Sequence, residues 1–188
     1  MSTITWPSGL TPRQFSLRLA PVQRTHSSPF GGSEQVVDLL NDRWMVSMEL
    51  PADTHANMAA VEAFIAAMRG QTNTVALYHW ARQAVRGTLA SGTATGSIGA
   101  SSITVSGSGT LKAGDMIGAG GLLLQVAADV TLSGSGSVSL VNRLRTALSS
   151  AALTLTQPTA PFRLINQPAV PYVASFTDTV TLEFAEAI

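Results

Sequence analysis

The chain has no cysteine and little charge. Only 12% of its 188 residues are charged, against about 25% in an average globular protein. The absence of cysteine excludes a disulfide framework and a thiolate metal site, so packing or partners must stabilise the fold. The net charge of zero and the pI near 6.8 leave no basic surface for nucleic acid or an acidic membrane. A surface this poor in charge favours association.

Long apolar runs and targeting signals are also missing. No window holds about 18 uninterrupted apolar residues, and the start, MSTITWPSGLTPRQ, lacks a basic segment followed by an apolar one. The mean hydropathy of +0.25 comes from Ala, Val and Leu spread through strand-like segments. We therefore expect a soluble, unexported chain that does not insert into a membrane.

Motifs for catalysis or cofactor binding are absent. There is no HExxH, no GxSxG and no GxxxxGK[ST], and Leu123 occupies the third glycine position of GxGxxG in the stretch that begins at Gly118. The three histidines, His26, His55 and His79, have no carboxylate at metal-ligand spacing. We predict no catalytic residue, no metal site and no cofactor, and therefore no enzyme.

Two acids are the remaining candidates for chemistry. Asp115 and Asp129 are the only carboxylates between residues 87 and 160, and a carboxylate pair can serve acid–base catalysis or bind a cation. Each lies next to a predicted strand, where Asp commonly caps a turn. The turn interpretation is favoured.

The first part of the chain has the pattern of strands around one helix. Alternating residues predict strands over 14–19, 43–50 and 74–80, and a longer period-two run predicts a closing strand over 172–184 that pairs with the N-terminal strands. Asp53 or Thr54 can cap a helix that Gly70 ends. Its apolar face would consist of Val61, Phe64, Ile65 and Met68.

The segment between the first two strands is too long for a tight turn and too apolar for a solvated loop. It is predicted to be a projecting arm with Ser-Pro-Phe-Gly-Gly at its tip, where Pro29 fixes one backbone angle and Gly31 or Gly32 can adopt positive φ. A disordered loop is the alternative. An aromatic residue at such a tip, Phe30, is expected to be buried against a neighbouring subunit.

Composition changes after Gly87. Through Ala160 the chain has only five charged residues, and short β-prone runs are separated by Gly and Ser. These runs, typical of a small barrel or sandwich, are 103–105, 116–117, 122–126, 130–132, 138–141 and 153–155. The segment TVSGSGTL at 104–111 recurs as TLSGSGSV at 131–138. The repeat can record two equivalent hairpins, but independent use of one turn chemistry is the favoured explanation.

Four prolines follow between residues 158 and 171. They predict a stiff return segment that cannot lie in a central strand and crosses back between the domains.

Trp44, Trp80, Tyr78 and Phe30 are candidates for an aromatic platform that binds sugars or bases, and core packing is the alternative. The strand pattern places Trp44 inward, which favours packing.

In the order of its sequence segments, the chain resembles the distal tail proteins of long-tailed bacteriophages and prophages. The resemblance covers the whole chain and rests on the order of six segments: Ser28–Val36, the Trp44 strand, the Ala-rich helix ending at Arg69-Gly70, Lys112–Ile117, Val126–Asp129 and Pro161–Leu164. The resemblance implies a tail-tube-like β-sandwich or split barrel with one α-helix, carrying an inserted small β-barrel domain. Residues 1–86 and 161–188 would form the ring domain and residues 87–160 the insertion.

The function implied by the resemblance is structural. A ring, usually a hexamer, would connect the tail tube to the tail tip and baseplate in the virion, after assembly in the host cytoplasm. Its partners would be further copies of the chain, the tube protein, the tip or hub proteins and the tape-measure protein, and DNA would pass through without specific binding. The expected subunit-interface residues are Pro29, Phe30, Gln35 and Val36.

A docking module carried by the insertion is the alternative function, with a host surface or a receptor-binding protein as partner. No Trp, Tyr or Phe lies between Arg82 and Pro161, which disfavours sugar stacking and leaves protein docking through aliphatic surface open. An enzyme ranks last, because the scattered Asp, Ser and His residues form no motif.

Overall fold

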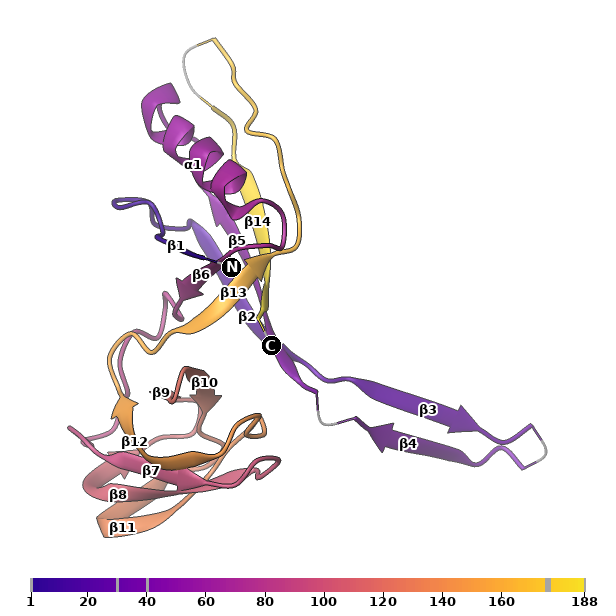
Figure 1. The fold of residues 1–188 in the computed structure, drawn as a ribbon, viewed down its shortest axis with the longest axis vertical. Coiled ribbons are helices and arrows are strands. Elements are labelled where there is room, and N and C mark those ends of the chain that lie inside the picture. The colour runs from indigo at the N-terminus through magenta and orange to yellow at the C-terminus, as the bar shows by residue number, and fades with distance from the viewer. Residues whose placement is uncertain (1, 30, 40, 175–176, 188) are drawn as a thin grey trace.

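The computed structural model of the chain describes residues 2–29, 31–39, 41–174 and 177–187. The fold is mostly β, with 48% of residues in strands and 8% in helix, which confirms the predicted fold class. The described part contains two six-stranded sheets, a two-stranded arm and one helix (Figure 1).

The first sheet combines the two ends of the chain. Its strands, in spatial order, are β1 (Thr3–Ile4), β6 (Thr74–Leu77), β13 (Ala160–Leu164), β14 (Val180–Glu186), β5 (Arg43–Leu50) and β2 (Gln14–Ala20). Only the β1–β6 pair is parallel. The C-terminal strand β14 pairs with β5, from Val180 opposite Leu50 to Ala185 opposite Met45, as the sequence predicts.

Helix α1 (His55–Met68) covers one face of this sheet. The Thr54 hydroxyl accepts a hydrogen bond from the Asn57 N–H at 3.4 Å and so caps the helix, which ends at Arg69 with φ 47°. The buried residues of the helix include Met58 as well as the predicted Val61, Phe64 and Met68. They share one core with the inward residues of β5, which are Trp44, Val46, Met48 and Leu50. Along β5 these buried residues alternate strictly with half-buried ones.

The second sheet lies between the two halves of the first in sequence. Its strands, in spatial order, are β10 (Leu122–Gln125), β9 (Met116–Ala119), β12 (Leu148–Thr154), β7 (Thr93–Gly96), β8 (Ser102–Leu111) and β11 (Val130–Ser139). A bridge between Val126 and Leu140 links its two edges, so the sheet curls around a core of its own. Met116 and Leu123, however, pack into the core of the first sheet.

Gly120-Gly121 separates β9 from β10, as the sequence predicts, but the Gly-Ser runs at 106–109 and 133–137 lie inside strands, contrary to the prediction. The predicted run 130–132 and the first two residues of the run 138–141 belong to the single strand β11, whose ten residues pair with all ten of β8. The two copies of the repeated segment are therefore cross-strand partners, with Gly134 opposite Gly107. Both earlier explanations, two hairpins or two turns, are wrong. Strand β7 carries too weak a pattern to be predicted.

Close backbone contact explains the glycines of β8. The segment from Gly87 to Gly92 crosses β8 so tightly that a Cβ on Gly107 would lie 2.7 Å from the Ser91 carbonyl oxygen, and one on Gly109 would lie 2.7 Å from Leu89 Cα. Gly109 also has a φ of 142°, a conformation that side chains rarely adopt. The composition that suggests turns is instead required by packing of one backbone against another.

The return segment was also predicted wrongly. Pro161 lies in β13, between β6 and β14 in the middle of the first sheet. The strand tolerates it because the β13–β14 pairing begins one residue later, at Phe162 opposite Glu186. Pro161 contributes only its carbonyl oxygen, which accepts the Ala187 N–H at 2.8 Å, so its missing donor falls at the end of the ladder.

Two predicted strands are too long. The strand over 74–80 ends at Leu77, and the aromatic residues after it leave the sheet. Among the described residues of the closing run, only 180–186 form a strand, whereas Tyr172 forms an isolated bridge with Thr177 and is 47% exposed. Phe176, part of the predicted alternation, lies outside the described residues. The predicted alternation also extends over 172–174, but these residues are exposed and form no buried face.

Candidate subunit interface on the arm

The arm is a two-stranded hairpin that leaves the body of the protein (Figure 1). Strands β3 (Gln23–Ser27) and β4 (Glu34–Asp38) pair in antiparallel register, and all ten residues are exposed. At the tip the Ser28 N–H donates to the Ser33 carbonyl oxygen at 2.9 Å, and Gly32 has a φ of 62°. The segment is thus a projecting arm, as predicted, rather than an irregular loop.

The arm continues strands of the first sheet. Strand β2 leads into β3 through Pro21, and β4 leads into β5. The β2–β5 pairing reaches Ala20 opposite Arg43, and a hydrogen bond from Leu39 N–H to Val22 O, at 2.9 Å, joins the two strands again at the base of the arm. The four strands form one long hairpin whose outer half has no layer packed on it within the described chain.

The two faces of the arm differ in character. Because side chains alternate along a strand, Val36 lies on the same face as Glu34 and Asp38. Its cross-strand partner on β3, Thr25, lies on this face too. The other face carries Arg24, His26, Gln35 and Val37. Val36 is 57% exposed. Each face therefore offers one apolar side chain beside charge, acidic on the Val36 face and basic on the other.

The structure separates the residues expected at the interface. Pro29 is exposed at the tip, and Gln35 and Val36, although adjacent, lie on opposite faces of β4. Phe30 lies outside the described residues. Sequence reasoning missed Val37 and Leu39, which are exposed by 37% and 42%; the signal that could have found them is the run of apolar residues in a segment that has no partner to cover it.

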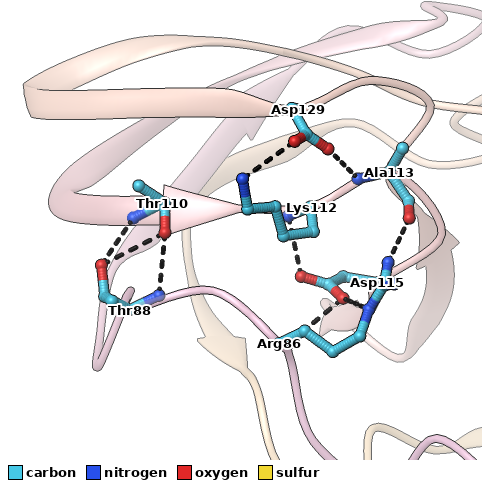
Figure 2. A network of polar contacts seen from close by, with 7 residues as sticks. All are labelled: Arg86, Thr88, Thr110, Lys112, Ala113, Asp115 and Asp129. Carbon is cyan, nitrogen blue, oxygen red and sulfur yellow. Dashed lines mark hydrogen bonds and ion pairs between the residues drawn. The ribbon is translucent and has the colours of Figure 1, made fainter.

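The two acids of the second sheet organise a turn, as favoured from the sequence (Figure 2). Asp115 Oδ2 accepts the Lys112 N–H at 2.8 Å, and Oδ1 accepts Arg86 Nε at 2.9 Å and the Arg86 N–H at 3.2 Å. Asp129 accepts the Ala113 N–H and the Lys112 ammonium, at 2.8 and 2.9 Å. Figure 2 shows both carboxylates surrounded by these donors.

The electrostatics of Asp115 agree with a structural role. Burial, at 2% exposure, raises the pKa of its carboxyl group, but the donors from Lys112 and Arg86 outweigh burial and hold the pKa below its usual value. An ionised carboxylate whose oxygens already accept these hydrogen bonds is a poor general acid. The arrangement fixes the segment 112–115 against Arg86.

The histidines lie apart. His26 is exposed on β3. His55, the first residue of α1, has its Nε2 atom 2.9 Å from the Val173 carbonyl oxygen. Burial lowers the pKa of His79, and the charge of Arg82 lowers it further. The His79 Nδ1 atom accepts the backbone N–H of Arg82 at 3.0 Å. Within the described ranges no three His, Cys, Asp or Glu side chains are grouped to hold a metal ion.

Among the described residues, Trp44, Tyr78 and Trp80 do not form a shared aromatic platform. Trp44 is 3% exposed and its indole N–H donates to the Leu123 carbonyl oxygen at 2.9 Å. Tyr78 and Trp80 stack with ring centroids 4.6 Å apart, and Trp6 packs edge-on against Trp80 at 5.5 Å. Core packing accounts for Trp44, and the half-buried rings pack on one another at the edge of the same core.

Two further observations complete the description. Among the described residues, no helix has the length and apolar character needed to cross a bilayer. Comparison with models of known protein families and with curated proteins gives no match.

Proposed function

We propose that the chain is a structural, ring-forming component of a bacteriophage tail, of the distal tail kind that connects the tail tube to the tail tip or baseplate. The arm of each copy would contact the next copy in a head-to-tail contact that closes into a ring, typically a hexamer. The partners are then further copies, the tube protein, the tip proteins and the tape-measure protein. DNA passes through without specific binding.

The exposed arm is the observation that carries this proposal. A two-stranded hairpin alone is marginally stable in water, and this one has no core in its own chain: all ten strand residues are exposed, and both of its edges lack a third strand within the described residues. A partner would cover Val36 or Val37 and pair with an edge. The mostly β body with one helix and the net charge of zero agree with a conduit wall that does not capture DNA.

The test is the oligomeric state of the full chain by native mass spectrometry. We expect a closed homo-oligomer for the wild type and loss of that species for Val36→Glu, because a carboxylate would replace the apolar contact beside Glu34 and Asp38. Val173→Glu is the matched control: Val173 is 44% exposed outside the arm, and its change should leave the oligomer intact. A wild-type monomer at all concentrations, both free and mixed with purified tails, would contradict the proposal.

Placement in the virion needs a separate measurement. We expect the chain in purified tail particles, located at the tip end by labelling of an introduced tag and imaging. Its absence from tails that assemble normally would reject the tail assignment even if the chain forms a ring.

A docking module is the second candidate, because Ile98 is 70% exposed on the turn between β7 and β8 of the inserted sheet. An apolar side chain this exposed at a loop tip can anchor a protein partner. Ile98→Ser should then abolish capture of a tail-fibre or receptor-binding protein while the oligomer stays unchanged. Equal capture by the variant would reject this alternative.

A further inference from the structure

The loop 141–147, between β11 and β12 of the second sheet, lies against the base of the arm. It carries two arginines whose partners belong to the first sheet and the arm. Arg143 Nη2 lies 3.3 Å from Asp38 Oδ2, the last residue of β4, and both side chains are more than a third exposed. Solvent screens such a pair, so this contact guides the arm weakly.

Arg145 makes the stronger connection. Its Nη2 donates to Glu186 Oε1 on β14, and its Nη1 donates to the Asp42 carbonyl oxygen at 2.9 Å, on the link between β4 and β5. The Arg145 side chain is 16% exposed and that of Glu186 is 1% exposed. One guanidinium group therefore joins three segments: its own loop, the link at the base of the arm and the last strand of the first sheet.

Neighbouring bonds fix the same base from the other side. Glu186 Oε2 accepts the backbone N–H of Trp44 at 3.0 Å, and the Trp44 indole donates to the Leu123 carbonyl oxygen at 2.9 Å. The positions on both sides of Arg43 are thus tied, Asp42 to Arg145 and Trp44 to Glu186 and Leu123. A buried carboxylate that loses its cation is left uncompensated, so the ion pair holds its geometry firmly.

From these contacts we infer that the loop 141–147 fixes the direction in which the arm leaves the first sheet, with Arg145 as the positioning residue. The inserted sheet then has a role inside its own chain, because a displacement of that sheet is passed to the arm through Arg145. The inference concerns the single chain and does not depend on ring formation.

The test measures the direction of the arm in the full chain. Because the protein has no cysteine, Gln35→Cys on the arm and Ala63→Cys on α1, both exposed positions, can carry spin labels for double electron–electron resonance. Dilution with unlabelled chain suppresses distances between copies. We expect one narrow distance distribution for the wild type and a clearly broadened or shifted one for Arg145→Ala.

Matched variants separate this effect from loss of charge or fold. Arg18→Ala removes the same charge from an exposed position of β2 and should leave the distribution unchanged, and Arg143→Ala should broaden it less than Arg145→Ala. Glu186→Gln keeps an acceptor for the Trp44 N–H but loses the ion pair, so it should reproduce the broadening. A second label pair, Ser16→Cys with Ala63→Cys, reports on the first sheet itself and should not change.

Two results would overturn the inference: a distribution for Arg145→Ala and Glu186→Gln equal to that of the wild type, or a wild-type distribution as broad as that of the variants. If Arg145→Ala also disturbs the second label pair, Arg145→Lys decides, because lysine keeps the charge but cannot donate to Glu186 and Asp42 in the same geometry. Broadening confined to the arm supports the inference, and an unchanged arm rejects it.

Discussion

Asp115 and Asp129 show how two identical side chains that hold the same turn, residues 112–115, differ in what they contribute. Both accept backbone and side-chain donors, but Asp115 is 2% exposed whereas the Asp129 side chain is 61% exposed. Water can replace the donors of Asp129 if they are removed. It cannot reach Asp115 in the same way, so the hydrogen bonds of Asp115 matter more to the fold.

Replacing Asp115→Asn should lower the free energy of unfolding by about 1–3 kcal/mol at neutral pH, the cost of removing charge-assisted hydrogen bonds from a buried group. Chemical denaturation measures the change. Asp129→Asn, with the same change of charge, should have a clearly smaller effect. Equal effects for the two variants would mean that burial does not decide the contribution.

The effect of Asp115 should depend on pH in one direction. Its pKa in the folded chain lies below the usual 3.8, so the unfolded chain binds the proton first as pH falls, and the stability that the carboxylate provides is complete above 3.8 and lost below it. The difference between wild type and Asp115→Asn should therefore shrink when unfolding is measured at acidic pH below that value. A difference that stays constant, or grows, would contradict this assignment.

At the scale of elements, strand β8 depends on glycine for contact with the segment 87–92. Gly109→Ala should destabilise the chain by about 1–3 kcal/mol, because its Cβ would meet the Leu89 backbone at 2.7 Å and the overpacked strand must shift. Thermal unfolding followed by circular dichroism measures the change.

Gly134→Ala supplies the control for Gly109. Gly134 lies on the partner strand β11 with a φ of 89°, but a Cβ there would have no atom within 4 Å. The control therefore reports the strain of the backbone alone and should be the milder variant. If it is as damaging as Gly109→Ala, the crossing segment is not the reason for the glycine.

Sequence patterns predicted the elements whose residues alternate against a buried face. Strand β5 has the predicted bounds, and α1 has the predicted cap and three of the four predicted face residues fully buried. The same reasoning failed for β8 and β11, because their Gly-Ser runs have the composition of turns but lie inside paired strands. It also failed for Pro161, because the position of a proline relative to the end of a ladder depends on the pairing of distant strands.

The candidate interface could be predicted in part. The length and apolar content of residues 21–42 indicated the arm, whereas the separation of Gln35 and Val36 onto opposite faces follows only from the register of β3 with β4. The connection through Arg145 could not be predicted, since Asp42 and Glu186 lie 103 and 41 residues away in the chain and no local pattern relates them.

At the scale of the whole molecule, the two sheets share contacts that should make them unfold together. Met116 and Leu123 of the second sheet belong to the core of the first, and the Trp44 indole bonds to Leu123. We expect one calorimetric transition for the wild type. Leu123→Ala, which leaves a cavity costing about 2–5 kcal/mol between the sheets, should separate it into two.

Leu132→Ala is the control for this prediction. Leu132 is 3% exposed and packs only in the core of the second sheet, so its truncation removes the same atoms without touching the junction. It should lower the transition temperature and keep a single transition. Two transitions in the wild type would show that the sheets are thermodynamically independent. A single transition in Leu123→Ala, as in Leu132→Ala, would show that the coupling does not depend on Leu123.

The continuity of the long hairpin has a mechanical consequence. Because β4 leads into β5 through residues 39–42, a pull applied along β4 arrives at a strand that is hydrogen-bonded on both sides, to β14 and to β2. Tension is thereby spread over two ladders at once instead of peeling away a single edge, and the weakest point under force is the arm itself rather than the sheet that anchors it.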